Sequence, residues 1–150
     1  FGVQTTEGKP VSFSLWCKYK AGPVYKDKDG NVLDKTDTPS IYAVLYEPEK
    51  DDNGDPIRLN GYNAKTSPTI ISIAEINDEQ IDAIRVNNPD ADDYVKISMP
   101  FVERKAFSYE KLEQGKYYIA IVLSSSSDGN LFEGAVDSSL CVDEISITIE

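Results

Sequence analysis

Aromatic side chains are the residues of this chain best suited to binding chemistry. The sequence holds nine tyrosines, five phenylalanines and one tryptophan. Sugar rings present flat faces of C–H bonds, on which tryptophan and tyrosine rings stack while nearby polar groups bind the hydroxyls. Exposed aromatic residues on a strand would therefore indicate a carbohydrate-binding surface.

Trp16 is the first candidate for such a surface. From Val11 to Lys20 the odd positions are apolar and the even ones polar, except for Trp16. Because side chains alternate across a strand, Trp16 is predicted to point away from Leu15 and Cys17. Lys18 shares its side and can donate to a hydroxyl or a uronic acid. A loop or another domain can equally cover Trp16, and an ordinary solvated lysine explains Lys18.

Three tyrosines are secondary candidates. Tyr42 and Tyr46 share a phase in an apolar strand that can be buried on both sides, so packing is favoured over ligand contact for both. Tyr118 has a better phase for exposure, because the odd positions from Tyr117 to Leu123 form an inward-facing apolar set.

Catalysis is less favoured than binding. Histidine is absent, which excludes serine-triad, cysteine–histidine and histidine–metal chemistry. A glycosidase needs two carboxyls roughly 5 to 9.5 Å apart, and among 26 acidic residues some pair will always meet that spacing. Glu47, Glu75 and Glu103 are therefore expected to be solvated or salt-bridged. A glycoside hydrolase or lyase remains an alternative, and so does a structural or protein-interaction module of a cell-surface complex.

Two acidic runs imitate the start of a calcium loop. They are Asp27, Asp29 and Asn31, and Asp51, Asn53 and Asp55. Neither has the glycine or the glutamate that the EF-hand loop requires at its sixth and twelfth positions. Hairpin turns explain both runs, and no metal or cofactor is predicted from them.

Composition limits the partners further. The net charge is −11 and no Lys/Arg run interrupts the acidic excess, so nucleic acid is not an expected partner. No apolar stretch approaches the ~20 residues that span a bilayer. A chain of 150 residues without a linker is expected to be one domain, residues 1–150.

Short bursts of period-two alternation predict an all-β fold. A hairpin is expected over Val24–Leu33, around Asp29-Gly30-Asn31, and one or two helical turns, capped by Asn77, over Asp78–Ile84. Besides the strand that carries Trp16, the predicted strands are Ile41–Glu47, Ile57–Leu59, Thr69–Ile76, Tyr94–Phe101, Tyr117–Ser124, Leu131–Glu133 and Ser139–Ile149. Strands at this spacing form a sandwich or barrel.

Several segments resemble a known family. The segments Leu15–Pro23, Ile41–Glu47, Ser124–Gly129, Phe132–Leu140 and Val142–Ile145 are similar to the putative carbohydrate metabolism domain of Bacteroidetes surface and periplasmic proteins. The resemblance covers nearly the whole chain in the right order. It implies a galactose-binding-like jelly-roll sandwich, similar to carbohydrate-binding modules, and no established catalytic residues. Where the family usually has aromatic residues, this chain has Cys17 and Cys141.

The resemblance also implies a setting. Such domains often follow a smaller immunoglobulin-like domain in an exported protein, so we expect the C-terminal domain of a longer extracellular, cell-surface or periplasmic protein. The expected function is non-catalytic binding of a polysaccharide or oligosaccharide. Similar jelly rolls often hold a structural calcium near the last strand, where Asp143 lies, although this is an implication of the resemblance alone.

The two cysteines carry a further expectation. Jelly rolls place their first and last strands side by side and antiparallel, and Cys17 and Cys141 both fall in the predicted inward phase. We therefore expect the two residues to be neighbours. A disulfide is possible in an exported protein, and a pair of packed thiols is the alternative.

Overall fold

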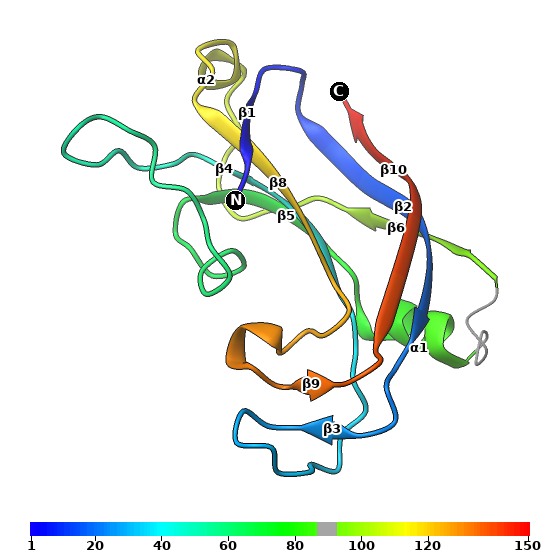
Figure 1. Ribbon diagram of the computed structural model, residues 1–150. Coiled ribbons are helices and arrows are strands. Elements are labelled where there is room, and N and C mark those ends of the chain that lie inside the picture. Colours follow the sequence, from blue (N-terminus) through cyan, green and yellow to red (C-terminus); the bar gives the residue numbers. More distant parts are fainter. Residues whose placement is uncertain (87–92) are drawn as a thin grey trace.

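The computed structural model describes residues 1–86 and 93–150, which form two antiparallel sheets packed face to face (Figure 1). The larger sheet, sheet A, has the strand order β1 (Val3–Thr5), β8 (Tyr117–Ser124), β4 (Ser40–Tyr46), β5 (Ile70–Glu75) and β7 (Val102–Glu103). The smaller sheet, sheet B, has the order β10 (Ser139–Ile149), β2 (Pro10–Lys20) and β6 (Val95–Pro100). The predicted all-β sandwich is confirmed.

The core lies between the two sheets. Alternation along β2 sends Phe13, Leu15 and Cys17 inward, where each is fully buried against Ile41 and Ala43 of β4. The helix α1 (Asp78–Val86) closes one end of this core with Ile84. No helix among the described residues is long and apolar enough to cross a membrane.

The outer face of sheet A has a cover of its own. The connection between β4 and β5 crosses this face and places Leu59 and Ala64 against Val44 and Tyr46. All residues from Ile41 to Tyr46 are consequently buried, on both sides of the strand. Burial on both sides explains why both phases of this strand are apolar in the sequence, which left its inward side undecided.

A small third sheet projects from one end of the sandwich. It pairs β3 (Tyr25–Lys26) with β9 (Gly134–Ala135). The predicted hairpin closes beside it, through a bridge between Lys26 and Val32. The Asp27 carboxylate accepts hydrogen bonds from the backbone N–H groups of Asp29 and Asn31, which is the turn chemistry predicted for this acidic run.

Most predicted elements are present. The strands predicted over Val11–Lys20, Ile41–Glu47, Thr69–Ile76, Tyr94–Phe101, Tyr117–Ser124 and Ser139–Ile149 are confirmed to within one or two residues. The predicted helix is also present, and Asn77 and Gln80 cap it reciprocally, each side chain accepting a hydrogen bond from the other's backbone N–H. The helix α2 (Tyr109–Glu113) and the strands β1 and β7 were not predicted, because each is too short to show a hydrophobic periodicity.

Two predicted strands are wrong. Ile57–Leu59 has no strand conformation, because Leu59 packs under the loop rather than in a ladder. In Leu131–Glu133, Leu131 is the last residue of a 3₁₀ helix over Gly129–Leu131, and Phe132 takes a left-handed conformation with φ 60°. The chain resumes extended pairing only at β9.

The two cysteines are on neighbouring strands, and both are free. The antiparallel pairing of first and last long strands is confirmed, but Cys141 is opposite Lys18 and Cys17 is opposite Val142. A bulge between Asp143 and Ser146, with Glu144 at φ 48°, changes the phase of β10. Cys141 is therefore exposed on the outer side while Cys17 is buried, so the predicted shared inward phase is wrong, and the two thiols neither form a bridge nor pack together in the core.

Candidate functional site

The outer face of sheet B carries Trp16, as the alternation predicts. Trp16 is 36% exposed and is flanked by Lys96 of β6 and Asp143 of β10. Lys18, the other predicted residue on this side, has its Nζ 5.1 Å from the ring centroid of Tyr94. We name this group of Trp16, Lys18, Tyr94 and Lys96 the tryptophan face. Tyr94 was missed as a site residue, although it begins the predicted strand Tyr94–Phe101 and shares the phase of Lys96 there.

The outer side of sheet A carries a hollow instead of a flat face. A cleft of about 310 Å³ opens between the turns at residues 60–66 and the loop at residues 124–130. Figure 1 shows that these two segments lie near each other on one side of the sandwich. We name it the tyrosine cleft. Its lining includes Tyr42, Tyr62, Lys65, Thr66, Ser124 and Asn130.

The two tyrosines of this cleft differ in what they offer. Tyr62 is 72% exposed, and hydrogen bonds within Asn60–Asn63 hold its turn: the Tyr62 N–H donates to Asn60 Oδ1, and the Asn60 N–H donates to Asn63 Oδ1. Tyr42 is buried at the floor, and burial, followed by the charge of Glu75, raises its pKa. A ligand could therefore stack on Tyr62, whereas Tyr42 is only 4% exposed and offers little surface for stacking.

Lys65 and Asn130 place polar groups on opposite sides of the cleft. Lys65 Nζ lies 2.7 Å from Glu75 Oε1 and 5.5 Å from the ring centroid of Tyr42. The ammonium group is thus held between the Tyr42 ring and the carboxylate of Glu75, which does not line the cleft. Asn130 on the opposite side is exposed, so its amide is accessible as both a donor and an acceptor.

A buried carboxylate fixes one side of the tyrosine cleft. Asp37 is only 1% exposed, and its Oδ2 accepts hydrogen bonds from Ser126 Oγ (2.6 Å), the Ala135 backbone N–H (2.8 Å) and Ser138 Oγ (2.7 Å). Its Oδ1 accepts from the backbone N–H of Thr38. Asp37 therefore ties the serine-rich loop, a wall of the cleft, to the small third sheet. An aspartate in a polar stretch carries no sequence signal for such a role.

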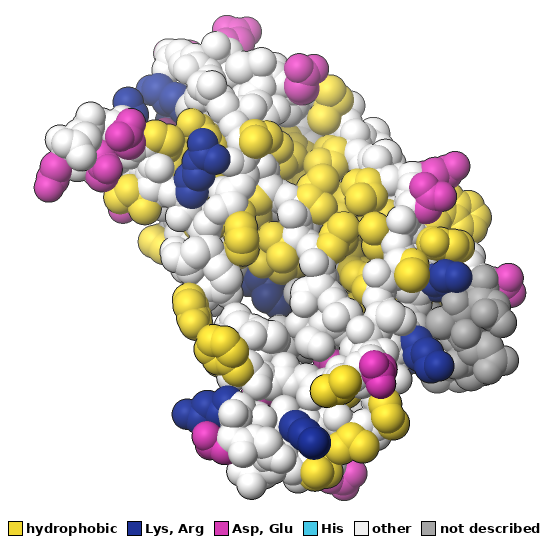
Figure 2. Space-filling model, viewed as in Figure 1, with side chains coloured by type: hydrophobic (Ala, Val, Ile, Leu, Met, Phe, Trp, Pro, Cys, Tyr) yellow, Lys and Arg dark blue, Asp and Glu magenta, His cyan; other side chains and the backbone are white. Residues whose placement is uncertain are grey.

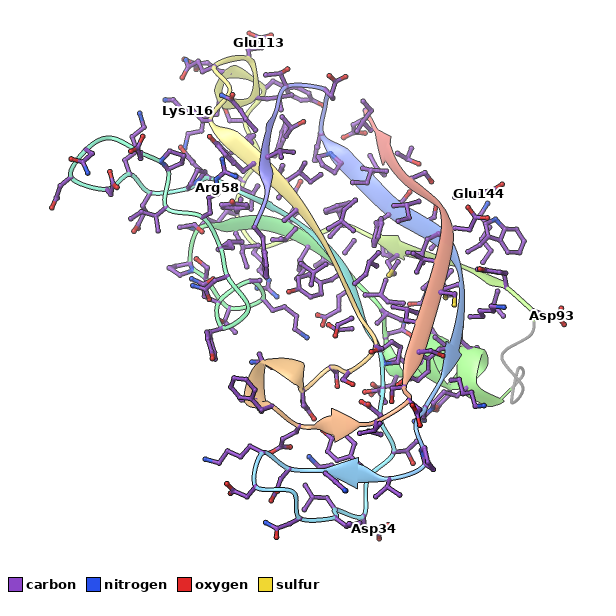
Figure 3. The ribbon with its side chains drawn as sticks, in the orientation of Figure 1. Asp34, Arg58, Asp93, Glu113, Lys116 and Glu144 are labelled. Atoms are coloured by element: carbon purple, nitrogen blue, oxygen red, sulfur yellow. The ribbon has the colours of Figure 1, made fainter. Side chains whose placement is uncertain are left out.

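The remaining predicted aromatic residues lie elsewhere. Tyr46 is fully buried, with its ring 5.9 Å from that of Tyr118, so packing explains it. Tyr118 is half-buried and lines a separate cleft of about 610 Å³ together with Glu47 and Lys116. Arg58 and Lys116, labelled in Figure 3, lie at that end of sheet A, and the Arg58 guanidinium is 5.8 Å from the Tyr118 ring centroid. The five predicted binding residues consequently do not form one site.

The predicted acidic residues are salt-bridged. Glu47 pairs with Lys111 and Glu75 with Lys65, each at 2.7 Å, and Glu103 pairs with Lys9 at 2.6 Å. This is the ordinary role expected of them. Among the described residues, none that lines the tyrosine cleft carries a carboxylate. Glu47 and Glu49 line a different hollow of about 260 Å³, which has no aromatic lining.

The acidic run at residues 51–55 is a turn. The backbone N–H groups of Asn53 and Asp55 both donate to Asp51 Oδ1, at 2.9 Å. Because the carboxylate is used by its own loop, this run forms a hairpin tip, as does the run that begins at Asp27. Across the described part of the chain, His, Cys, Asp and Glu side chains do not gather in groups of three that could hold a metal.

Comparison with known structures agrees with the sandwich fold. A putative glycoside hydrolase from Bacteroides thetaiotaomicron is 33% identical, with a TM-score of 0.82, over 100% of this chain and 40% of that one. A putative glycoside hydrolase from Bacteroides vulgatus is 27% identical, with a TM-score of 0.79, over 100% of this chain and 56% of that one. This chain therefore spans about half the length of these proteins or less. No protein of curated function matches the sequence.

The fold thus defines an antiparallel β-sandwich domain of the type found in these Bacteroides proteins. The family model described as "putative carbohydrate metabolism domain" matches residues 1–148. The chain belongs to this family, as its sequence segments indicated, and is a domain related to carbohydrate metabolism.

Proposed function

We propose that this domain is a non-catalytic carbohydrate-binding module and that a sugar ring occupies the tyrosine cleft. One observation carries the proposal: an exposed aromatic ring, Tyr62, stands at a cleft lined with hydroxyls, an amide and an ammonium group, without a carboxylate. Stacking on an aromatic ring combined with a few polar contacts is how proteins bind sugars.

The cleft is a better site than the tryptophan face for a physical reason. A sugar in the cleft would be contacted from the 60–66 side and from the 124–130 side, so more of its surface would leave water. A sugar on the tryptophan face would touch one surface only, and the Lys18 ammonium already lies near the Tyr94 ring. Trp16 and Lys18 are therefore the alternative surface.

The charges at the cleft favour a neutral glycan. Lys65 supplies the side-chain ammonium group in the lining, and its Nζ is already paired with Glu75. A uronic acid or sulfated sugar would have to compete with that carboxylate and would bring further negative charge to a chain of net charge −11. The extracellular setting stays a prediction from the family resemblance.

Affinity gels cast with a panel of neutral and acidic polysaccharides test the proposal, followed by calorimetry with the oligosaccharide of any glycan that retards the protein. Tyr62→Ala should weaken binding at least about 10-fold, or about 1.4 kcal/mol. Trp16→Ala should change it less than about twofold. Tyr109→Ala, which removes another exposed tyrosine far from the cleft, is the matched control.

Each contrary result has a distinct meaning. If Trp16→Ala abolishes binding while Tyr62→Ala does not, the tryptophan face is the site and the cleft assignment is wrong. If no glycan retards the protein, carbohydrate binding itself is wrong.

Hydrolysis is the second candidate function. It is favoured by the names of the two Bacteroides structures and by the hollow that Glu47 and Glu49 share. Release of reducing sugar that survives purification and disappears in Glu47→Gln or Glu49→Gln would establish it. We expect no release, because Glu47 is paired with Lys111 and the hollow lacks an aromatic surface for a sugar.

A further inference from the structure

The sandwich is open along one side, between β8 and β10. Figure 2 shows a band of hydrophobic side chains there, on the face where Figure 1 shows these two strands apart. We name this band the open edge; its residues are Ile121 and Leu123 of β8 and Leu140, Val142, Ile145 and Ile147 of β10. At one end a hollow of about 350 Å³ lies between Leu123 and Leu140.

Side chains at the open edge are exposed because no strand covers them, not because they point away from the core. Ile121 is paired with Ala43, which faces the core and is fully buried, so Ile121 is on the inner side of sheet A. It is nevertheless 42% exposed, whereas Leu15 on the inner side of β2 is fully buried. The reason is that sheet B has three strands against five in sheet A, which leaves Ile121 without a covering strand, whereas Tyr117 at the start of β8 is buried against Leu45 and Leu112.

The backbone at this edge is also unpaired. Among the described strands, β10 pairs with β2 alone, which leaves its other edge free along Ser139–Ile149. On the opposite side of the gap, β1 pairs with β8 only from Tyr117 to Ile119. An unpaired strand edge is a template for another strand, and an extended peptide can satisfy both its hydrogen bonds and its apolar side chains.

Charge distinguishes between possible strands. The segment from Ser139 to Glu150 contains Asp143, Glu144 and Glu150 and no lysine or arginine. A second copy pairing through β10 would bring these carboxylates together, and like charges across an antiparallel pair are destabilising. Glu144, labelled in Figure 3, lies on the side of β10 away from β8, so it would meet the outward side chains of an added strand.

We propose that the open edge binds an extended polypeptide strand in which aliphatic and basic residues alternate. The strand adds to the free edge of β10 as a fourth strand of sheet B. Its aliphatic side chains cover Ile121 and Ile145, and its basic side chains face outward, near Asp143 and Glu144. This is a protein-binding surface on a different side of the sandwich from the tyrosine cleft.

A nine-residue peptide of alternating valine and lysine, capped at both ends, is the probe. We expect fluorescence anisotropy to show binding, and hydrogen exchange followed by mass spectrometry to show slowed exchange in β10. The same peptide with glutamate in place of lysine should bind at least tenfold more weakly. Methylating the peptide nitrogens on one edge should abolish binding, because that edge can then no longer donate to β10.

Variants of the chain locate the surface. Ile121→Lys places a charge in the open edge and should weaken peptide binding at least tenfold. Ile57→Lys alters a similarly exposed isoleucine, 51% against 42% for Ile121, outside the open edge and should leave binding unchanged. Both positions are exposed, so both variants should fold, and Ile145→Lys gives an independent second substitution.

Three outcomes would overturn the proposal. Equal binding of the lysine and glutamate peptides would show that the acidic residues of β10 do not select a basic strand. Slowed hydrogen exchange outside β10 would show that the peptide does not pair with the edge of β10. Sedimentation showing a dimer that Ile121→Lys dissociates, and that the peptide does not compete with, would make a second copy the occupant.

Discussion

The two outer faces of the sandwich begin from the same kind of strand and end in opposite states. On sheet A, the β4–β5 connection covers Tyr42 and Tyr46, which are buried. On sheet B, no described segment crosses Trp16 in the same way, and it keeps 36% of its surface exposed. An aromatic side chain on an outer face is therefore core or surface according to what the distant chain places over it.

The largest expected effect tests this difference directly. Tyr46→Ala should lower the free energy of unfolding by ~3–5 kcal/mol, the range for truncating a buried aromatic side chain. Trp16→Ala should lower it by less than ~1.5 kcal/mol. Urea denaturation followed by circular dichroism measures both, and Tyr46→Leu replaces the first variant if that one does not fold. Equal losses at the two positions would mean that Trp16 is covered as well.

A somewhat smaller effect is expected at Asp37, which holds one wall of the tyrosine cleft. Asp37→Ala should cost ~3 kcal/mol of unfolding free energy, because it leaves buried donors from Ser126, Ala135 and Ser138 without their acceptor. It should also weaken glycan binding in the cleft while leaving peptide binding at the open edge unchanged. Asp34→Ala, at an exposed aspartate that does not line the cleft, is the control. Loss of both binding activities would indicate general unfolding instead.

Alkaline pH should gradually lower the free energy of unfolding, because two core residues lose their neutral form. Burial raises the pKa of Cys17 to about 11, and burial together with the charge of Asp37 raises the pKa of Tyr19 to about 12. Because the fold favours their neutral forms, their contribution to stability is complete below pH 9, near the ordinary pKa of a thiol. It should be lost as the pH rises toward 12.

Urea midpoints measured between pH 7 and pH 11.5 check this expectation. Cys17→Ala should reduce the slope in the lower part of that range. A midpoint that does not change with pH would contradict the burial of both groups.

The smallest effect is chemical and leaves the fold intact. Cys141 is exposed and Cys17 is buried, with a raised pKa, so a thiol reagent at pH 8 should modify one cysteine in the native protein and two in urea. Cys141→Ser should remove the native reaction. Two reacting thiols in the native state would mean that β2 opens readily, and none in the unreduced, denatured state would mean that a bridge forms after all.

Parts of the candidate sites were within reach of the sequence. The exposure of Trp16 and the inward set of β8 follow from alternation, because side chains on a strand repeat every two residues whatever surrounds them. Tyr62 and Asn130 were not predicted, because Tyr62 lies in a turn and Asn130 in a single 3₁₀ turn, where no alternation applies. Their placement at one cleft depends on two loops that are far apart in the sequence.

What the sequence determined by itself is local: which residues form strands, and which side chains share a side within an uninterrupted strand. The tertiary structure decided which side chains other segments cover, and which side of the sheet a strand presents after a bulge. Ile121 has the inward phase of a core residue and is exposed because sheet B lacks a strand over it. Cys141 has the apparent phase of Ile145 and Ile147 and faces outward because the bulge at Glu144 inserts one residue. Alternation is a property of neighbouring residues, whereas burial is a property of whatever the rest of the chain brings near, and only the folded structure contains that information.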